Sequence, residues 1–425
     1  MKKLLQTILR WIAKSILRKY RPKIIAITGS VGKTSAKEAI YLVLKDNFRV
    51  RKSEGNYNTE IGVPLTIIGA ESGKSSLWRW FLVIFKGLRR RMSAQPYPEI
   101  LILEYGADRP GDIKYLAENF PPDIGVVTAI GKTPVHLQYY RNRDQLVAEK
   151  SLLVKFTSPA GAVVLNSDDE DVSKMSALAK GKCVRFGLEN QAEIQAVGIN
   201  LKTEDNGDWG LHFKISAGGT SVPLFIPGLL AEHMLYPALA SAACGIELGM
   251  NFVDIAQKLA AFRPPRGRLN YLAGVKGSNI LDDTYNSSPA AAMRALELME
   301  KLPARRRIAV LGDMLELGGA SENAHREIGR EIARCKADVL VTVGKMAKFM
   351  AEDAAASGMD KQQIFSFEKS GDAVTLVKNL IESGDLVLVK GSQGVRMEKI
   401  VKEILADPNK AEDLLVRQSR EWLSR

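Results

Sequence analysis

The most constraining feature of the sequence is a short apolar run that leads directly into a glycine-rich loop and then into a helical pattern. Residues 23–27 have the composition of a buried strand, and residues 28–35 follow as Thr-Gly-Ser-Val-Gly-Lys-Thr-Ser. Glycines let backbone N–H groups approach phosphate oxygens, and the first turn of the next helix directs further N–H groups at the same anion. The strand–loop–helix order therefore predicts nucleotide binding, with an ordinary glycine-rich turn as the alternative.

This loop offers a candidate residue for each part of a nucleoside triphosphate. Lys33 is expected to reach the β- and γ-phosphates, and the Thr34 hydroxyl is expected to bind Mg²⁺. The usual pattern begins with one more glycine, whose place Ile27 takes here, so the loop is a compact form. The predicted nucleotide-binding residues of the loop are Gly29, Ser30, Val31, Gly32, Lys33, Thr34 and Ser35.

Apolar runs of strand length recur along the chain and alternate with helical patterns. These runs lie at residues 100–103, 124–128, 162–165, 308–311, 339–343 and 386–389. Their alternation with helices predicts an α/β fold with mostly parallel sheets and helices on both faces. Shorter alternating runs with turn sequences between residues 183 and 226 predict a small antiparallel sheet.

A break rich in proline and arginine at residues 263–268 predicts the boundary between two domains. We expect a central P-loop ATPase domain at residues 23–265, with an insertion at residues 74–92. A C-terminal, Rossmann-like α/β domain is expected at residues 266–425, closed by a helix over residues 411–422. The three cysteines are far apart in sequence and have no metal-ligand spacing, which is typical of thiols in a reducing compartment.

The net charge of +12 comes from two short segments. Residues 1–23 contain eight basic residues, residues 74–92 contain six, and neither segment contains an acidic residue. These fourteen charges exceed the net charge of the whole chain, so the remainder has no positive excess. This distribution argues against a nucleic-acid partner.

Both basic segments are also apolar. The first, expected to be an amphipathic helix over residues 1–22, has leucines and isoleucines at helical spacing, and the second has tryptophans and phenylalanines. Basic, apolar and aromatic residues together predict peripheral contact with an anionic membrane; the alternative is two helices packed on the body of the protein. The apolar runs are shorter than the ~20 residues of a spanning helix, and Arg10 interrupts the pattern of a signal peptide. We expect a cytoplasmic protein that can contact the inner face of the plasma membrane.

The compact Gly-Lys-Thr loop resembles that of the Mur ligases and the folylpolyglutamate synthetases, and further segments follow in the order of the Mur ligase family. In the central domain they are residues 56–64, 101–107 with Glu104, 134–137 with His136, 147–151 with Lys150, and 165–169 with Asn166. In the C-terminal domain, residues 266–268, 281–289, 310–318 and 390–392 resemble the branch of the family that adds D-alanyl-D-alanine. The resemblance covers residues 23–425.

The resemblance implies roles for individual residues. Thr34, Glu104, His136 and a carbamylated Lys150 would hold Mg²⁺, which relieves repulsion between phosphates and a carboxylate substrate. Asn166, Asp283, Tyr285 and Asn286 would contact the nucleotide. Lys33, Lys150, His136 and Arg268 are the predicted catalytic residues, with Arg268 reaching a phosphate. Without the family pattern, the same residues would be a loop-end carboxylate, a structural histidine, a surface lysine and Asx turns.

These features predict an ATP-dependent ligase that activates a carboxylate as an acyl phosphate and couples it to an amine. The implied cofactors are ATP and Mg²⁺, and the implied partners are a peptide-bearing carboxylate of peptidoglycan synthesis and D-alanyl-D-alanine or a similar amine. Because only 22 residues precede the first predicted strand, we expect a chain without the family's N-terminal UDP-sugar-binding domain. The alternatives are the same chemistry on a lipid-linked or other non-UDP acceptor, and a membrane-associated P-loop NTPase.

Overall fold

The computed structural model describes residues 2–55, 57–131, 139–189, 192–204 and 208–423. The chain divides into two compact units, which are described separately. The first comprises Met1–Lys202, Leu211–Pro227 and Glu232–Phe262, and the second comprises Thr203–Gly210, Gly228–Ala231 and Arg263–Arg425.

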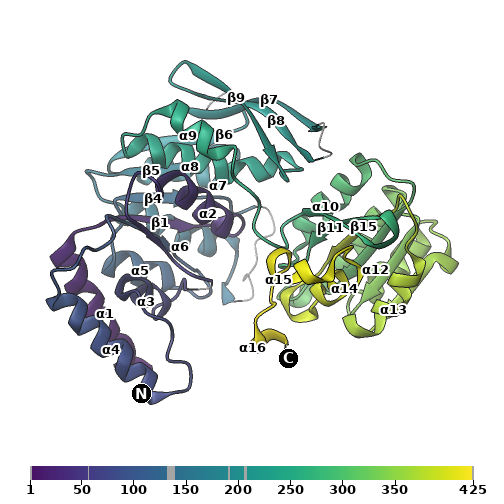
Figure 1. Cartoon of the computed structure of the whole chain (residues 1–425), viewed down its shortest axis with the longest axis horizontal. Coiled ribbons are helices and arrows are strands. Elements are labelled where there is room, and N and C mark those ends of the chain that lie inside the picture. The colour runs from purple at the N-terminus through teal and green to yellow at the C-terminus, as the bar shows by residue number, and fades with distance from the viewer. Residues whose placement is uncertain (1, 56, 132–138, 190–191, 205–207, 424–425) are drawn as a thin grey trace. The chain divides into compact units, whose positions relative to one another are not determined.

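The described part of the first unit is built around a nine-stranded sheet with the order β2-β3-β1-β4-β5-β6-β7-β8-β9 (Figure 1). Its strands are β1 (Lys23–Thr28), β2 (Val50–Lys52), β3 (Ile100–Glu104), β4 (Ile124–Val127), β5 (Ala162–Asn166), β6 (Lys182–Gly187), β7 (Ile194–Thr203), β8 (Trp209–Ala217) and β9 (Thr220–Pro227). β1 pairs in parallel with both β3 and β4. The carboxyl ends of these strands therefore meet at one edge of the sheet.

Helices cover both faces of this sheet, as predicted. They are α1 (Lys2–Tyr20), α2 (Lys33–Leu44), α3 (Gly62–Ile68), α4 (Leu77–Met92), α5 (Asp112–Asn119), α6 (Arg143–Phe156), α7 (Glu170–Lys174), α8 (Tyr236–Glu247) and α9 (Phe252–Leu259). Residues of α1, α3, α5 and α6 share one apolar core with alternate strand residues such as Ala26 and Leu103. α2 and α8 pack against each other and against β3, β5 and β6.

The stretch at residues 183–226 extends the main sheet. β6 pairs in parallel with β5 and with β7, and β8 and β9 follow at the edge. The small, separate antiparallel sheet predicted for this stretch is not formed, because its strands belong to the nine-stranded sheet. Alternating apolar and polar residues fit such a position, because a strand near an edge can have one face in the core and one in solvent.

The second unit has a six-stranded sheet among its described residues, with the order β10-β11-β15-β12-β13-β14. The strands are β10 (Asn270–Ala273), β11 (Asn279–Asp283), β12 (Arg307–Gly312), β13 (Val339–Val343), β14 (Ile364–Phe367) and β15 (Leu386–Lys390), and the main helices are α10 (Pro289–Lys301), α11 (Ser321–Arg334), α12 (Lys348–Ala356), α13 (Ser370–Leu380) and α14 (Glu398–Ile404). All neighbouring strands are parallel except β10 and β11. β15 lies between β11 and β12, and such a change in strand order places a binding site at the carboxyl ends. The Rossmann-like α/β prediction is confirmed.

The continuous closing helix predicted over residues 411–422 is wrong. Two short helices, α15 (Ala411–Leu414) and α16 (Arg420–Leu423), take its place. Arg417 lies between them with φ = 59°, which is in the left-handed region. A right-handed helix cannot continue through that backbone conformation.

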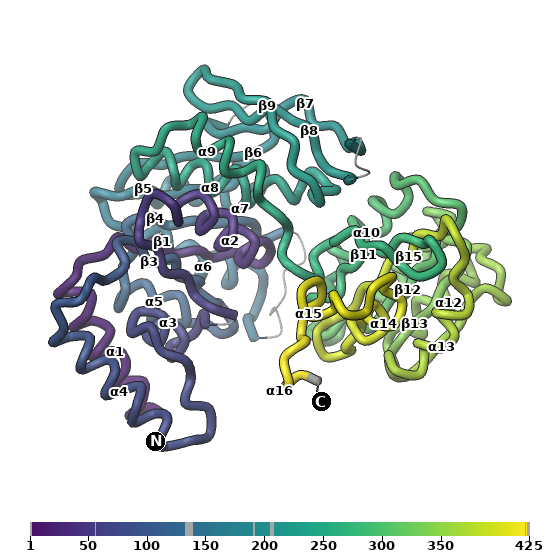
Figure 2. Tube along the Cα trace, in the orientation of Figure 1, coloured from purple at the N-terminus to yellow at the C-terminus, as the bar shows by residue number. Residues whose placement is uncertain are grey.

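The N-terminal basic segment is part of the first unit. α1 buries Leu9, Ile12, Ala13 and Ile16, and it lies beside α4 in both ribbon and tube views (Figure 2). The two helices approach closely, because a Cβ added at Gly87 would lie 2.6 Å from Cγ2 of Ile12. No helix within the described ranges has the length and apolar character needed to cross a membrane.

Candidate active site

The glycine-rich loop connects the carboxyl end of β1 to the amino end of α2. Gly29 has φ = 146° and Gly32 has φ = 86°, both outside the range that other residues adopt readily. A Cβ on Gly29 would lie only 2.0 Å from Oγ1 of Thr128. Glycine is therefore required at position 29 for both backbone conformation and space.

The glycine-rich loop is hydrogen-bonded to the segment that follows β4. The N–H groups of Ser30 and Val31 donate to the backbone oxygen of Ala129 at 2.7 and 3.2 Å. In return, the Thr128 hydroxyl donates to the backbone oxygen of Val31 at 2.6 Å. Thr128 and Ala129 were not predicted as site residues, since they lie about a hundred residues from the loop in sequence.

The amino end of α2 has the properties of an anion site. No side chain caps this helix within the described residues, so the N–H groups of its first turn can turn toward an anion. The Ser30 hydroxyl is buried and has no hydrogen-bond partner in the described part of the chain. A phosphate group would satisfy these donors, so the loop fits the nucleotide that the sequence predicts.

Two lysines converge on one backbone oxygen of the loop. Nζ of Lys33 lies 2.8 Å from the oxygen of Gly29, and Nζ of Lys150, which comes from α6, lies 3.0 Å from the same atom. Lys150 is only 2% exposed. Its burial, and secondly the charge of Lys33, hold the pKa of Lys150 well below its usual range. The neutral form of Lys150 is therefore more populated than the neutral form of an exposed lysine would be.

Glu104, the last residue of β3, faces the same end of α2. Its Oε2 lies 3.4 Å from the Thr34 hydroxyl and 3.4 Å from Nζ of Lys37. Lys37 and Glu104 are both buried, at 1% and 4% exposure. The sequence analysis did not identify Lys37, although its position one turn after Lys33 and Thr34 on the same helix face was the available signal.

The residues predicted to hold Mg²⁺ fit a site in which the phosphates of the nucleotide supply some of the ligands. No cluster of three histidine, cysteine or acidic side chains in the described ranges could hold a metal alone. Mg²⁺ is usually bound through one or two protein oxygens together with phosphate and water oxygens. Thr34 and Glu104 supply two such oxygens near the loop. His136, the third predicted ligand, lies outside the described residues.

Asn166 is the last residue of β5, and its side chain is hydrogen-bonded within the loop that follows. Its Oδ1 accepts a hydrogen bond of 3.0 Å from the N–H of Asp168. Asp169 in the same motif accepts from the N–H groups of Ile130 and Gly131 at 2.8 and 2.9 Å. The motif thus shapes two neighbouring loops, and the nucleotide contact of Asn166 stays a prediction.

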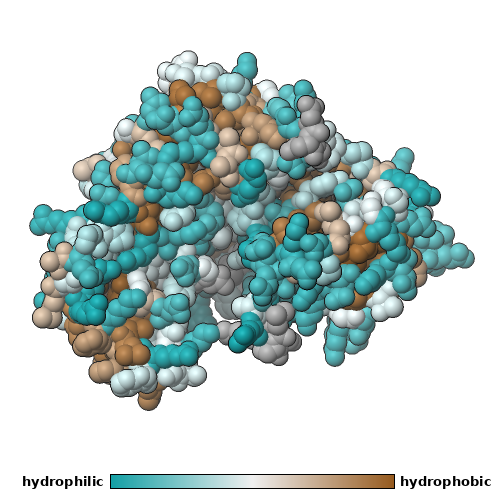
Figure 3. All heavy atoms as spheres, in the orientation of Figure 1, coloured by the Kyte–Doolittle hydropathy of each residue, from teal (hydrophilic) through white to brown (hydrophobic). Residues whose placement is uncertain are grey.

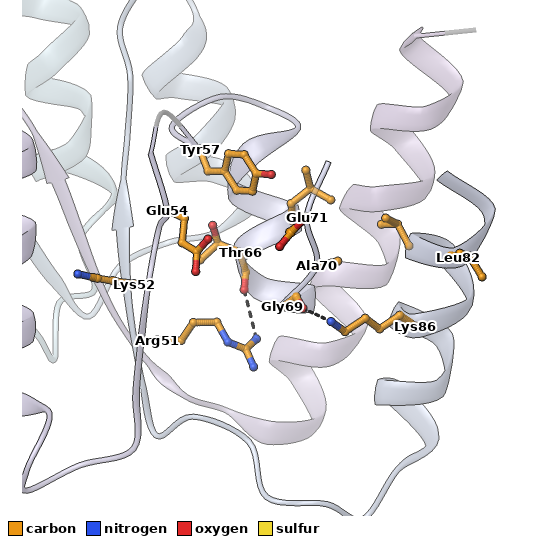
Figure 4. A pocket seen from close by; sticks show the side chains of 12 residues that line it. Arg51, Lys52, Glu54, Tyr57, Thr66, Gly69, Ala70, Glu71, Leu82 and Lys86 are labelled. Carbon is orange, nitrogen blue, oxygen red and sulfur yellow. Dashed lines mark hydrogen bonds between the residues drawn. The ribbon is translucent and has the colours of Figure 1, made fainter. Parts of the chain in front are cut away.

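A pocket of about 480 Å³ lies between β2, α3 and α4 (Figure 4). Arg51 and Lys86 point toward the carboxyl end of α3 there. Nη1 of Arg51 donates to the backbone oxygen of Ile67 at 2.9 Å, and Lys86 donates to that of Gly69. These cations satisfy the open carbonyl groups of the helix end, and none of the predicted site residues lines the pocket.

In the second unit, Asp283 and Lys390 meet where β11 and β15 end. Nζ of Lys390 lies 2.5 Å from Oδ2 of Asp283 and 3.0 Å from the backbone oxygen of Asn286. The other carboxylate oxygen of Asp283 accepts from the N–H of Leu269 at 3.2 Å. Both charged side chains are buried. The pair therefore fixes the loop that carries the predicted residues Tyr285 and Asn286.

Arg268 and Tyr285 are stacked. The guanidinium carbon of Arg268 lies 4.1 Å from the centre of the Tyr285 ring, and Nε of Arg268 is buried without a partner in the described part of the chain. Arg417 donates to the backbone oxygen of Tyr285 at 3.2 Å and pairs with Glu398 at 3.1 Å. Arg417 was not predicted, and it lies in the tail that the sequence suggested was a helix.

Two further motifs of the second unit connect loops to one another. Ser392 Oγ accepts from the N–H of Leu315 at 2.9 Å and donates to the backbone oxygen of Ser287 at 3.4 Å. Nε2 of His325 accepts from the N–H of Met314 at 2.9 Å, so Nδ1 donates to the Ser321 oxygen. Burial lowers the pKa of His325, which suits this neutral, structural role.

Most of the predicted residues that the structure describes fall into one group in each unit. Lys33, Thr34, Glu104 and Lys150 surround the glycine-rich loop of the first unit, and Arg268, Asp283, Tyr285 and Asn286 lie around the carboxyl end of β11 in the second. The first group can bind a phosphate and a divalent cation. The second group combines an aromatic face with a guanidinium Nε that has no partner among the residues that the structure describes.

Comparison with protein families gives two matches in chain order. The Mur ligase middle domain matches residues 27–77 and 87–245. The glutamate ligase domain of Mur ligases matches residues 267–393. The first match is interrupted at residues 78–86, which belong to α4.

Comparison with individual proteins gives the same result. The UDP-N-acetylmuramoyl-tripeptide–D-alanyl-D-alanine ligase of Bacillus subtilis is 31% identical over 95% of this chain and 80% of its own length. The crystal structure of MurF from Acinetobacter baumannii is 25% identical, with a TM-score of 0.76 over 93% of this chain and 79% of that one. MurF from Thermotoga maritima, solved in complex with ADP, is 25% identical, with a TM-score of 0.75 over 94% of this chain and 83% of that one.

Proposed function

We propose, since the chain belongs to the Mur ligase family, that it joins D-alanyl-D-alanine to the peptide of a peptidoglycan precursor at the expense of ATP. The observation that carries this proposal is the convergence of Lys33 and Lys150 on Gly29 beside the uncapped end of α2. This arrangement provides positive charge and N–H donors at one place, which a reacting phosphoryl group requires.

In the proposed reaction, an oxygen of the acceptor carboxylate forms a bond to the γ-phosphorus of ATP, and the bond to the β-phosphate oxygen breaks. The amine nitrogen then attacks the acyl carbon of the resulting acyl phosphate, phosphate leaves, and the nitrogen loses a proton. The N–H groups of α2 and Lys33 hold the phosphates, and Lys33 exchanges its bond to Gly29 for one to phosphate. From the resemblance to the Mur ligases we carry over the proposal that Arg268, whose Nε has no partner among the described residues, binds a phosphate of ATP. Mg²⁺, held through Thr34 and Glu104, would neutralise phosphate charge.

For the acceptor, we propose a UDP-linked tripeptide. The name of the Bacillus subtilis relative specifies both UDP-N-acetylmuramoyl-tripeptide and D-alanyl-D-alanine. A lipid-linked or other acceptor would need the same carboxylate chemistry but a different carrier. A P-loop switch would not need the second unit, which matches the ligase domain of the family.

The decisive experiment is a substrate screen with ATP and D-alanyl-D-alanine against UDP-linked and lipid-linked tripeptides. We expect phosphate release and a product with the mass of the UDP-linked acceptor plus the dipeptide minus one water, and neither when the acceptor or the dipeptide is omitted. ATP turnover that is independent of both substrates would contradict the ligase. Product from the lipid-linked acceptor alone would contradict the proposed carrier.

We also propose which part of the chain binds each substrate and where the protein is located in the cell. Residues 23–265 would bind ATP and residues 266–425 the amine, with α1 as a structural part of the first unit. The location would be the cytoplasm, where ATP is available, with peripheral contact at the anionic inner face of the plasma membrane. The acid-free, basic segments at residues 1–23 and 74–92 support this contact.

A further inference from the structure

α4 exposes an apolar face although it also packs on the protein. Val83 and Gly87 are its buried residues, and they face the body of the first unit. The opposite side presents Leu77 (71% exposed), Trp78 (66%), Phe81 (55%), Leu82 (46%), Phe85 (57%), Leu88 (37%) and Met92 (85%). We call these seven residues the α4 face. Figure 3 shows apolar side chains gathered over α1 and α4, beside hydrophilic ones.

α1 does not share this property. Its apolar side is buried, and Leu4 and Trp11 are its only large hydrophobic residues that stay exposed among the described residues. The guanidinium of Arg91 covers the Trp11 ring, with its carbon 5.1 Å from the ring centre. α1 therefore packs between α4 and the rest of the first unit with its apolar side buried. The exposed apolar surface belongs mainly to α4.

The charged side chains of α4 itself have one sign. Arg79, Lys86, Arg89 and Arg91 are exposed on the same helix, and residues 74–92 contain no acidic residue. Lys86 and Arg91 contact Gly69 and Trp11, whereas Arg79 and Arg89 form no side-chain hydrogen bond or ion pair within the described ranges. Such a surface is complementary to a layer of negative charge over an apolar interior.

Four of the seven exposed residues lie where the chain does not match the family domain. The match to the Mur ligase middle domain stops at residue 77 and resumes at residue 87. Trp78, Phe81, Leu82 and Phe85 fall within that gap. The common domain fold therefore does not depend on these side chains, and the fold of this unit leaves them uncovered.

We propose that the α4 face is the membrane-binding element of this protein. The aromatic and aliphatic side chains enter the headgroup and upper acyl region of an anionic leaflet, and Arg79 and Arg89 bind lipid phosphates. An aromatic face flanked by arginines suits the boundary between apolar and polar layers of a bilayer. This inference rests on the proposed membrane contact and assigns it to α4 instead of α1.

The first test is flotation of the full-length protein with vesicles of phosphatidylcholine alone or with added phosphatidylglycerol. We expect binding to the anionic vesicles only, and a loss of about tenfold or more when W78S, F81S and F85S are combined. These side chains are exposed, so the triple variant should keep its Tm. Val253→Ser, which changes a residue 42% exposed on α9, is the control and should bind normally.

The second test addresses charge. The double variant R79E/R89E should bind anionic vesicles roughly 25-fold or more weakly, about fivefold for each lost cation, and added salt should weaken the wild type in the same way. The matched double variant K155E/K301E makes the same change in net charge at two exposed sites elsewhere. It should retain most of the binding.

The outcomes separate the two proposals. If the wild type fails to bind anionic vesicles at low salt, the membrane contact itself is wrong. If the wild type binds and both α4 variants bind equally well, only the assignment to α4 is overturned. A wild type that sediments as a dimer, and a triple variant that is monomeric, would show that a second copy covers this face. Ligase activity in solution should be the same for all variants.

Discussion

Nζ of Lys150 lies 3.0 Å from the backbone oxygen of Gly29, although 121 positions separate the two residues. Lys33 donates to the same oxygen, and the two like charges raise the free energy of this arrangement. The lowered pKa of Lys150 keeps its amine available for reaction with CO₂. The resulting carbamate would replace a cation by an anion next to Lys33 and so remove the repulsion.

We therefore predict that Lys150 is carbamylated in the active enzyme. Ligase activity should fall in buffer depleted of bicarbonate and return when bicarbonate is added. ¹³C-labelled bicarbonate should give a carbamate NMR signal in the wild type but not in Lys150→Arg, which should lose activity about 10²-fold. Equal activity with and without bicarbonate would contradict the modification.

Lys33→Ala should reduce kcat by about 10²- to 10³-fold, because it removes a cation that stabilises the transferring phosphoryl group. The fold should be preserved, since Lys33 is half-buried at a helix end. Lys45→Ala, at the exposed carboxyl end of the same helix, is the matched control. Unchanged amide-bond formation in Lys33→Ala would overturn the proposed function.

The buried pair of Asp283 and Lys390 should be strongly coupled. Lys390→Met leaves a buried carboxylate without its cation, so the free energy of unfolding should fall by about 3–5 kcal/mol in urea titrations. The double variant D283N/K390M should be more stable than Lys390→Met alone, because no uncompensated charge remains. Additive losses from the two single changes would contradict the coupling.

Asp282 should make stability depend on pH. Burial, as the main cause, raises its pKa from 3.8 to about 7, so the folded state holds this proton more tightly than the unfolded state. The contribution of Asp282 to stability therefore falls as pH rises from 3.8 to about 7. Asp282→Asn should raise Tm relative to wild type at pH 8, and the difference should shrink toward pH 4. The exposed Asp413→Asn should show no such trend.

Arg417 should position the loop that carries Tyr285 and Asn286, which are predicted to contact the nucleotide. It donates to the backbone oxygens of Thr284 and Tyr285 while paired with buried Glu398. Arg417→Met should raise the KM for ATP about tenfold with a smaller change in kcat, because charged hydrogen bonds that hold Tyr285 are lost. Arg417→Lys should recover only part of the affinity, since an ammonium group lacks the planar fork of donors. A fall in Tm with no change in KM would indicate a purely structural role, and Arg420→Met is the exposed control.

Much of the fold follows from local patterns. The predicted strand at residues 339–343 is the observed β13, and the other five predicted runs agree with observed strands to within one residue at each end. The glycine-rich loop was identifiable because its function depends on consecutive backbone N–H groups, which short sequence spacing specifies. Asp283 and Glu104 were predicted through the resemblance to the Mur ligases, and each is the last residue of a strand, β11 and β3 respectively.

Other features could not be read from spacing. The sequence shows two basic, apolar helices, and only packing decides that α1 turns its apolar side inward while α4 exposes one. The partners Thr128 and Arg417 were missed for the same reason, whereas the spacing of Lys37 from Lys33 and Thr34 could have identified it. The break in the predicted closing helix depends on the left-handed conformation of Arg417, which its contacts with Glu398 and Tyr285 stabilise.

The sequence by itself determined the two α/β units, the phosphate-binding loop and the order of the family motifs, because these depend on residues close together in the chain. Tertiary structure decided that Lys150 reaches Gly29, that Lys390 neutralises Asp283, and that α4 has an uncovered apolar face. Contacts between distant residues arise only when strands and helices pack. The free energy of burying charges and apolar surface, which local sequence does not encode, selects among the possible partners.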